Sequence, residues 1–177
     1  MAAVRNAPVV AVMNLKGGVG KTTLSANVFR EFQRTMGKSV LLIDFDPQFN
    51  LTQLLVKESL YESLVSDNKT LLSVVRHPEP LTIFHVSESD LSTIEQTDSY
   101  IHRLAPKART AIDLVPGDFR IATYNLKEDQ SFLRLARQRI AALMAQARKE
   151  YDIVVIDCNP SVSFLTRTAL ENCSHLL

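Results

Sequence analysis

The strongest constraint on the fold is a glycine-rich loop near the N-terminus, set between an apolar run and a helical pattern. Residues Val9 to Met13 form a short, continuous apolar run, which is typical of a buried parallel strand. The segment Leu15 to Thr23 follows at once and contains three glycines and a Gly-Lys-Thr sequence. A helical pattern comes next, with apolar residues at every fourth position and a glycine at its end (Leu24, Val28, Phe32, Met36 and Gly37). The order strand, glycine loop, helix predicts a loop that binds phosphate groups.

The loop contains the residue types that phosphate binding needs. Glycines let the backbone bend until successive N–H groups converge on an anion, and the N-terminal end of the next helix adds positive potential. We expect Lys21 to reach the β- and γ-phosphates and the Thr22 hydroxyl to bind Mg²⁺, which prefers oxygen ligands. The alternative is a glycine-rich turn with two solvated lysines, which the surrounding pattern disfavours. The predicted nucleotide-binding residues are Lys16, Gly17, Gly18, Val19, Gly20, Lys21, Thr22 and Thr23.

Two further apolar strands end in carboxylates. Val40 to Ile43 is followed by Asp44 and by an Asp46-Pro47 turn, and Ile153 to Ile156 is followed by Asp157. In an open α/β sheet the carboxyl ends of the strands form the edge where ligands bind. We therefore expect carboxylates there, close to a metal ion and an attacking water. A lone Asp at a strand end is often only a cap or turn former, and for Asp44 taken alone that alternative is favoured.

The remaining pattern completes an α/β domain with a mostly parallel sheet flanked by helices. A short helix is expected around Leu51 to Leu55, and a range rich in Ser, Thr, Asp and Pro, 67–110, is expected to be a variable loop-and-helix excursion. Ile112 to Val115 is a predicted strand. Gln130 to Glu150 is a predicted amphipathic helix, followed by a helix from about Ser161 and a strand from Ser174. The apolar stripe of the long helix is Leu133, Ala136, Ile140, Leu143 and Ala147.

Composition excludes several classes of protein. Lys plus Arg total 20 and Asp plus Glu total 19, which excludes a highly basic DNA-coating protein but leaves room for a local basic patch. Cys158 and Cys173 lack the spacing of a disulfide framework or a zinc site, and we expect both to be buried. The arginines between 134 and 148 are interpreted as the solvent face of a helix. No apolar run is long enough to span a membrane, so we expect a cytoplasmic protein with no membrane partner.

These segments resemble a known family. Lys16 to Thr23 looks like the deviant Walker A motif of the ParA/MinD ATPases, and Asp44 to Asn50 resembles the second acidic motif of the ParA branch. Ile153 to Ser161 is similar to that branch's Walker B segment, and Asp113 to Gly117 resembles the strand and turn between the two. The resemblance covers the chain except for the stretch around 77–110, and it implies a P-loop NTPase fold.

The resemblance also implies roles for individual residues. Lys16 matches the signature lysine that crosses to the phosphates of the partner in a homodimer formed on ATP binding. Lys21 matches the lysine that acts within its own subunit, and Thr22 matches the Mg²⁺ ligand. Asp46 matches the residue that orients the attacking water and couples to Mg²⁺, and Asp157 matches the aspartate that holds the water shell of the metal. Lys16, Lys21 and Asp46 would thus be catalytic, and Thr22, Asp46 and Asp157 would serve the metal.

At the level of function the resemblance implies an ATPase that acts as a molecular switch. Such proteins bind DNA nonspecifically as the ATP dimer, and an adaptor protein stimulates hydrolysis, so that a plasmid, chromosome or other cargo is positioned. The resemblance also implies a location in the bacterial or archaeal cytoplasm or nucleoid. A nucleotide-gated regulatory module with little hydrolysis is the alternative, and an ATP-driven reductase component is disfavoured by the cysteine placement.

The sequence departs from the family pattern in two places. Asn159-Pro160 stands where the Walker B segment usually continues with two prolines, and we expect the site to tolerate this because Asp157 is unchanged. The family fold also continues for several more strands and helices. We therefore expect residues 1–177 to be the N-terminal portion of a single ATPase domain whose C-terminal strands and helices are missing.

Overall fold

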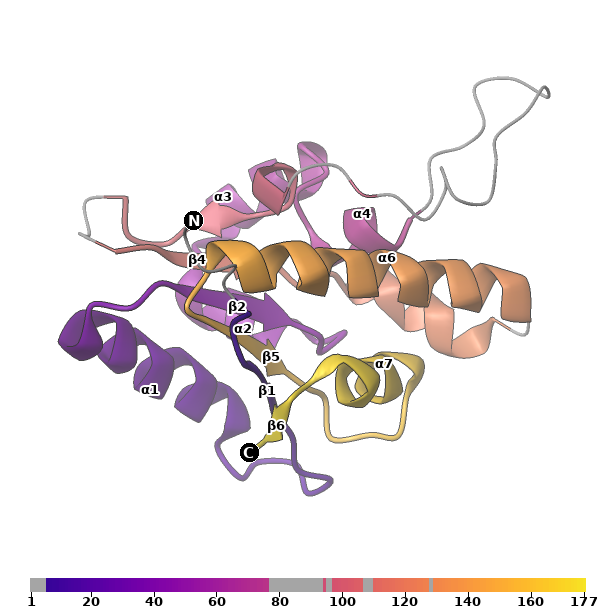
Figure 1. The fold of residues 1–177 in the computed structure, drawn as a ribbon. Coiled ribbons are helices and arrows are strands. Elements are labelled where there is room, and N and C mark those ends of the chain that lie inside the picture. Colours follow the sequence, from indigo (N-terminus) through magenta and orange to yellow (C-terminus); the bar gives the residue numbers. More distant parts are fainter. Residues whose placement is uncertain (1–5, 77–93, 95–96, 107–109, 128) are drawn as a thin grey trace, which may run out of the picture.

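The computed structural model describes residues 6–76, 94, 97–106, 110–127 and 129–177, and it is built on one six-stranded sheet between two layers of helices (Figure 1). The strand order is β3-β4-β2-β5-β1-β6. All pairs are parallel except β3 with β4. The strands are β1 (Val9–Val12), β2 (Val40–Asp44), β3 (His102–Arg103), β4 (Ile112–Val115), β5 (Ile153–Asp157) and β6 (His175–Leu176). This arrangement confirms the predicted α/β class.

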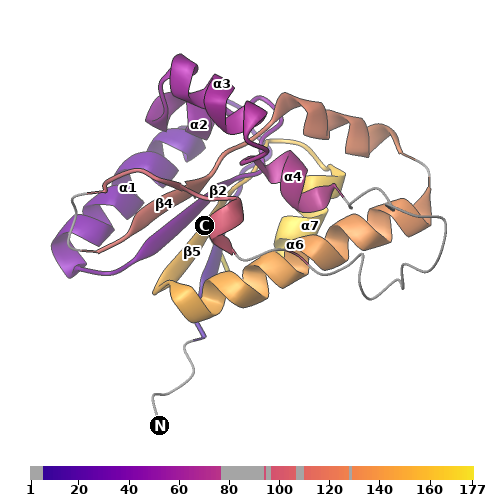
Figure 2. The same ribbon diagram turned by 90° about the horizontal axis from the view of Figure 1, so that it is seen from above.

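The inner strands are mostly apolar, with one aspartate each in β2, β4 and β5, because both faces of the sheet are covered. Every residue of β2 and β4 is buried. One face of the sheet packs on α1 (Lys21–Met36), α2 (Asn50–Leu55) and α3 (Glu58–Ser66), and the other on α4 (Leu71–Val75), α6 (Gln130–Glu150) and α7 (Phe164–Asn172) (Figure 2). Two 3₁₀ segments, η1 (Thr97–Ser99) and η2 (Phe119–Leu126), lie on the side of α6. A sheet covered on both sides explains why the strands lack alternation.

The long helix α6 has the predicted bounds, and all five residues of the predicted stripe are buried. Asp129 caps it, since its carboxylate accepts hydrogen bonds from the N–H groups of Ser131 and Phe132. The interpretation of its arginines as one solvent face was wrong at Arg139. That side chain is 3% exposed and donates from Nε to the carbonyl of Val74, 2.7 Å away. The arginine lies on the sheet side of α6 because α4 offers it a backbone acceptor there.

Helix α1 is present as predicted, but the residues at every fourth position do not form its buried face. Leu24, Val28 and Met36 are exposed by 36–62%. The buried positions are instead Ser25, Ala26, Phe29 and Gln33. On this face Ser25 donates to Asp157 of β5 at 2.8 Å, and Ala26 and Phe29 pack in the core.

The range 67–110 contributes to the core where it is described. Leu71 and Val74 of α4 are fully buried, and β3 extends the sheet by one antiparallel strand. That strand, together with α3 and η2, had no clear signal in the sequence. Residues 77–93, 95–96 and 107–109, which include His77 and His85, lie outside the described residues. Among the described helices, none combines the length and apolar character that crossing a membrane requires.

Candidate functional site

The candidate site lies along one edge of the sheet, where the carboxyl ends of four parallel strands meet. Parallel register aligns Val12 of β1 with Asp157 of β5, and Asp157 with Asp44 of β2. The phosphate loop leaves from the end of β1, and the Pro116-Gly117 turn leaves from the end of β4. The topology therefore gathers the predicted segments at one edge, although the phosphate loop and Asp157 lie more than 100 residues apart in the sequence.

The phosphate loop has the backbone that its glycines predict. Gly18 has a φ of 73° and Gly20 a φ of 88°, both in the left-handed region that favours glycine. Gly20 is also the residue before α1, and no side chain caps that helix. A Cβ added at Gly17, Gly18 or Gly20 would meet no atom within 4 Å, so the loop borders open space. Exposed, uncapped N–H groups beside open space fit an anionic ligand.

Asp157 joins the loop to β5. One of its carboxylate oxygens accepts a hydrogen bond from the Thr22 hydroxyl at 2.9 Å, and the other accepts one from the Ser25 hydroxyl at 2.8 Å. Burial raises the pKa of Asp157, whereas these two hydroxyls oppose the rise. The carboxylate of Asp46 and the ammonium of Lys21 also act on it, with opposite signs. Four predicted residues, Lys21, Thr22, Asp46 and Asp157, thus come together.

Asp46 is 7% exposed and lies in a tight turn after β2. Its Oδ1 accepts a hydrogen bond from the N–H of Gln48 at 2.9 Å, and its Oδ2 lies 3.5 Å from the amide nitrogen of Asn50. This bond to the backbone two residues on is typical of an Asx turn. The turn holds the carboxylate near Asp157 and leaves Oδ2 with only a long contact.

Asp44 has a structural role, as the alternative interpretation favoured. Its fully buried carboxylate accepts from the N–H and the hydroxyl of Thr52, at 2.8 and 2.7 Å, and from the N–H of Asp46 at 3.1 Å. The Thr52 hydroxyl in turn accepts from the N–H of Gly117 at 2.8 Å. Burial raises the pKa of Asp44 to about 7, against the lowering effect of these donors. The network fixes the start of the Asp46 turn to β4.

Gly117 is required by this network. A Cβ there would lie 2.8 Å from the Cβ of Phe49 and 3.0 Å from the carboxyl carbon of Asp44. Phe49 has a positive φ of 43° and stacks on Tyr61, with ring centroids 4.9 Å apart. The close approach of the two turns therefore depends on the missing side chain at position 117.

The residue that departs from the family pattern, Asn159, organises the segment after β5. Its side-chain oxygen accepts hydrogen bonds from the hydroxyls of Thr166 at 2.6 Å and Ser163 at 3.3 Å, and its amide donates to Ser161 at 2.6 Å. Ser163 caps α7 through the N–H of Thr166. Hydrogen bonds thus fix this segment where a proline would restrict φ.

The predicted residues fit a nucleotide with Mg²⁺ in their chemistry. Thr22, Asp46 and Asp157 offer oxygen atoms, which Mg²⁺ prefers, and Mg²⁺ usually keeps waters and phosphates as its other ligands. Among the described residues, no group of three or more His, Cys, Asp or Glu side chains gathers as a metal cage. Lys16 and Val19 are exposed on the loop, and the N–H of Lys16 donates to the side-chain oxygen of Asn14 at 2.9 Å. The assignment of roles to these residues stays a prediction.

Some site residues were not found from the sequence. Ser25 and Thr52 are fully buried and hold Asp157 and Asp44, yet a single hydroxyl within a helix gives no pattern to detect. Cys158 is buried as expected, and burial raises the pKa of its thiol to about 12, which makes it unreactive. The expectation was wrong for Cys173, which is partly exposed near the end of the chain.

The chain matches one family model over nearly its whole length and is similar in sequence to several known proteins. A family model described as an AAA domain matches residues 7–177. A Rhizobium rhizogenes protein named as a replication protein A is 32% identical over 96% of the chain and 39% of its own length. The chromosome partitioning protein ParA of Caulobacter vibrioides is 30% identical over 92% of the chain and 51% of its own length. The sporulation initiation inhibitor protein Soj of Bacillus subtilis is 29% identical, with 92% and 53% covered.

Solved structures share the fold. A protein of Corynebacterium diphtheriae is 29% identical with a TM-score of 0.68, over 96% of this chain and 57% of that one. The pNOB8 ParA bound to nonspecific DNA is 28% identical with a TM-score of 0.62, over 96% and 52%. A Mycobacterium smegmatis cobyrinic acid a,c-diamide synthase, solved with an ATP analogue and magnesium, has a TM-score of 0.66 at 23% identity, over 96% and 57%, and so shares the fold alone. The chain spans 38–56% of the length of the curated relatives it matches.

The Asp44 network generates a stability prediction. Thr52→Val keeps the shape of the side chain but removes a donor from a buried carboxylate and the acceptor of the Gly117 N–H. We expect the free energy of unfolding to fall by about 2–3 kcal/mol. Urea unfolding followed by circular dichroism measures it.

The matched control is Thr35→Val, on the exposed end of α1, whose hydroxyl contacts the carbonyl of Glu31. It should change the free energy of unfolding by no more than about 0.5 kcal/mol. Equal effects of the two substitutions would contradict the role given to Thr52.

Proposed function

The chain belongs to the ParA/Soj family of P-loop ATPases, and from that premise we propose that it is an ATP-dependent molecular switch. In this proposal it binds and hydrolyses Mg·ATP, dimerises on ATP and positions or partitions DNA or another cargo. The observation that carries it is the junction of Thr22 and Asp157, which ties the open phosphate loop to the end of β5. A structural turn would not need a buried carboxylate beside a lysine and a second aspartate.

The proposed roles follow from where the side chains lie. Lys21, at the first position of α1, is the point charge for the terminal phosphates, and the N–H groups of the uncapped helix end add hydrogen bonds. When bound, Mg²⁺ neutralises charge on the phosphates, and the hydroxyl of Thr22 would turn to it while Asp157 orders its water shell. Asp46, held by the Gln48 N–H, would orient the attacking water through the oxygen that makes only a long contact.

The interactions with other molecules are also proposals. Lys16 is exposed at the tip of the loop, where a lysine can reach a second subunit, and this supports a homodimer formed across two nucleotides. The relative pNOB8 ParA was solved with nonspecific DNA, and several relatives are named for partitioning. We therefore propose nonspecific DNA as one partner and an adaptor protein that stimulates hydrolysis as another. Part of the DNA surface would belong to the half of the relatives that this chain does not span.

The first prediction concerns binding. Lys21→Ala should abolish detectable binding of Mg·ATP, because the phosphates lose their charge partner in a partly enclosed loop. Isothermal titration calorimetry measures it. Lys149→Ala, which removes an exposed charge from the far end of α6, should bind like the parent chain. Unchanged affinity for Mg·ATP in Lys21→Ala would contradict the assignment of this loop as the phosphate-binding site.

The second prediction separates binding from turnover. Asp46→Ala should bind Mg·ATP with near-normal affinity but lower the hydrolysis rate at least about 100-fold, since the water loses its orienting group. Release of phosphate with DNA and the adaptor present measures the rate.

Asp46→Asn serves as the comparison, because an asparagine can still accept the hydrogen bond of the Gln48 N–H. It should be as inactive as Asp46→Ala if the charge matters. Normal hydrolysis in both variants would leave Asp46 as a turn residue and favour a nucleotide-gated regulatory module.

The third prediction concerns Lys16. If its ammonium crosses to a partner's phosphates, Lys16→Ala should bind ATP yet remain monomeric in analytical ultracentrifugation and lose ATP-dependent DNA binding. If the phosphate loop acted only within one subunit, Lys16→Ala would not separate ATP binding from dimerisation and DNA binding. Dimerisation of Lys16→Ala at the same ATP concentration as the parent chain would count against the cross-subunit role.

A further inference from the structure

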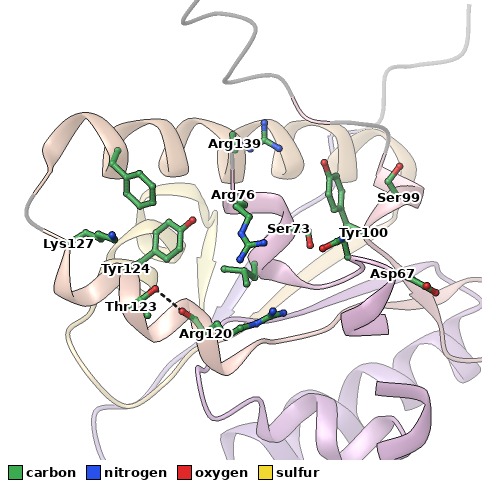
Figure 3. Close-up of a pocket in the computed structure, with 13 residues that line it drawn as sticks. Asp67, Ser73, Arg76, Ser99, Tyr100, Arg120, Thr123, Tyr124, Lys127 and Arg139 are labelled. Carbon is green, nitrogen blue, oxygen red and sulfur yellow. Dashed lines mark hydrogen bonds between the residues drawn. The ribbon is translucent and has the colours of Figure 1, made fainter. Parts of the chain in front are cut away.

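A second cavity, of about 980 Å³, lies on the α6 side of the sheet and shares no residue with the phosphate loop (Figure 3). Its walls come from the end of α3, from α4, η1 and η2, and from α6. Its volume is at the upper end of the range of about 300–1,000 Å³ that small-molecule sites occupy. The cavity is therefore large enough for a ligand of nucleotide size, on a face that the proposed function does not use.

The lining of the cavity is strongly cationic. Four of its described residues, Arg76, Arg120, Lys127 and Arg139, carry positive charge, and only Asp67 carries negative charge. Figure 3 shows Arg76 between Arg139 on α6 and Arg120 on η2, with Lys127 at one end. Because these side chains come from separate elements and face one space, they form a cluster rather than a line.

Two of the cations are held in place by the protein. Arg139 is 3% exposed and donates from Nε to the Val74 carbonyl at 2.7 Å. Arg120 donates two hydrogen bonds to the buried carboxylate of Asp118, at 2.9 and 2.6 Å. Burial would raise the pKa of Asp118, but the hydrogen bonds from Arg120 and Thr70 outweigh it and the pKa is lowered. Because these two side chains are already ordered, less conformational entropy is lost when a ligand binds to them.

Hydroxyl groups complete the lining. Ser73 and Thr123 line the cavity beside the arginines, with the Thr123 hydroxyl donating to the Arg120 carbonyl at 2.8 Å, and Tyr100 and Tyr124 line it with only 4–5% of their surfaces exposed (Figure 3). Burial raises the pKa of Tyr124, and the charges of Arg76 and Arg139 oppose this, which places both guanidinium groups near the phenol. Hydroxyl donors among arginines suit a phosphate group, which presents several acceptor oxygens.

We propose that this cavity, named here the α4–α6 cavity, binds a compact polyanion that carries two or more phosphate groups. A convergent cluster favours such a ligand over an extended acidic peptide, for which the cations would follow a groove. The proposal does not rest on the function proposed for the phosphate loop.

The test uses inorganic pyrophosphate and tripolyphosphate as probes, titrated calorimetrically into protein that carries Lys21→Ala, so that the phosphate loop does not compete. The probes should bind, and added salt should weaken them. Adding Arg76→Ala and Lys127→Ala should lower the affinity at least about tenfold, because two charge-assisted contacts are lost. Arg76 and Lys127 are both exposed, so the fold should be retained, which circular dichroism checks.

The matched control adds Arg134→Ala and Lys149→Ala, which remove the same charge from exposed positions of α6 outside the cavity. The control should bind the probes like its parent. Amide shifts in an NMR titration should concentrate at residues such as Ser73 and Thr123. The proposal would be overturned if the probes did not bind, or if the control variant lost as much affinity as the test variant. Amide shifts confined to residues 14–23 would overturn it as well. Binding of hexaglutamate without binding of either probe would also overturn it, in favour of an acidic peptide.

Discussion

The site depends on the parallel register of β1, β5 and β2, which brings the phosphate loop and two carboxylates to one edge. Asp157 lies opposite Val12 on one side and Asp44 on the other. A shift of one residue in β5 would turn the Asp157 side chain to the opposite face of the sheet and break its bonds to Thr22 and Ser25. A slip would also separate the buried carboxylates of Asp157 and Asp44 from the donors that satisfy them, which is unfavourable.

Burying three carboxylates so close together is unfavourable unless each is matched to donors. Asp44 has three donors and Asp157 has two hydroxyls with Lys21 nearby, whereas Asp46 has one short hydrogen bond and one long contact. The well-satisfied carboxylate is the structural one. The least satisfied oxygen belongs to Asp46, which is the residue with a proposed role toward water, and chemistry requires such spare acceptor capacity.

The sequence predicted what depends on local pattern and missed what depends on contacts across the fold. The inner strands, α6 and its buried stripe, and the loop geometry all follow from runs, periodicity and glycine placement. The buried face of α1 was not predicted, because the helix carries apolar residues on more than one face and only contacts across the fold select Ala26 and Phe29 for burial. Arg139 was misjudged for the same reason, since its acceptor is a carbonyl of α4, 65 residues away in the sequence. β3 is only two residues long and carries no pattern of its own.

The turn after β4 connects the two sites physically. On the side of the phosphate loop, the N–H of Gly117 donates to Thr52, and its carbonyl accepts from the Tyr61 hydroxyl at 3.2 Å. On the side of the α4–α6 cavity, the next residue, Asp118, holds Arg120 and Thr70, and the Pro116 carbonyl accepts from the N–H of Leu71 at 2.8 Å. Three consecutive residues thus set the position of the Asp46 turn and of one cavity wall. Because Gly117 has no room for a Cβ, this turn cannot adjust on one side without displacing the other. Substitutions at 116–118 would therefore disturb both sites, and only the side chains that face one site alone, such as Lys127 or Lys21, can separate them.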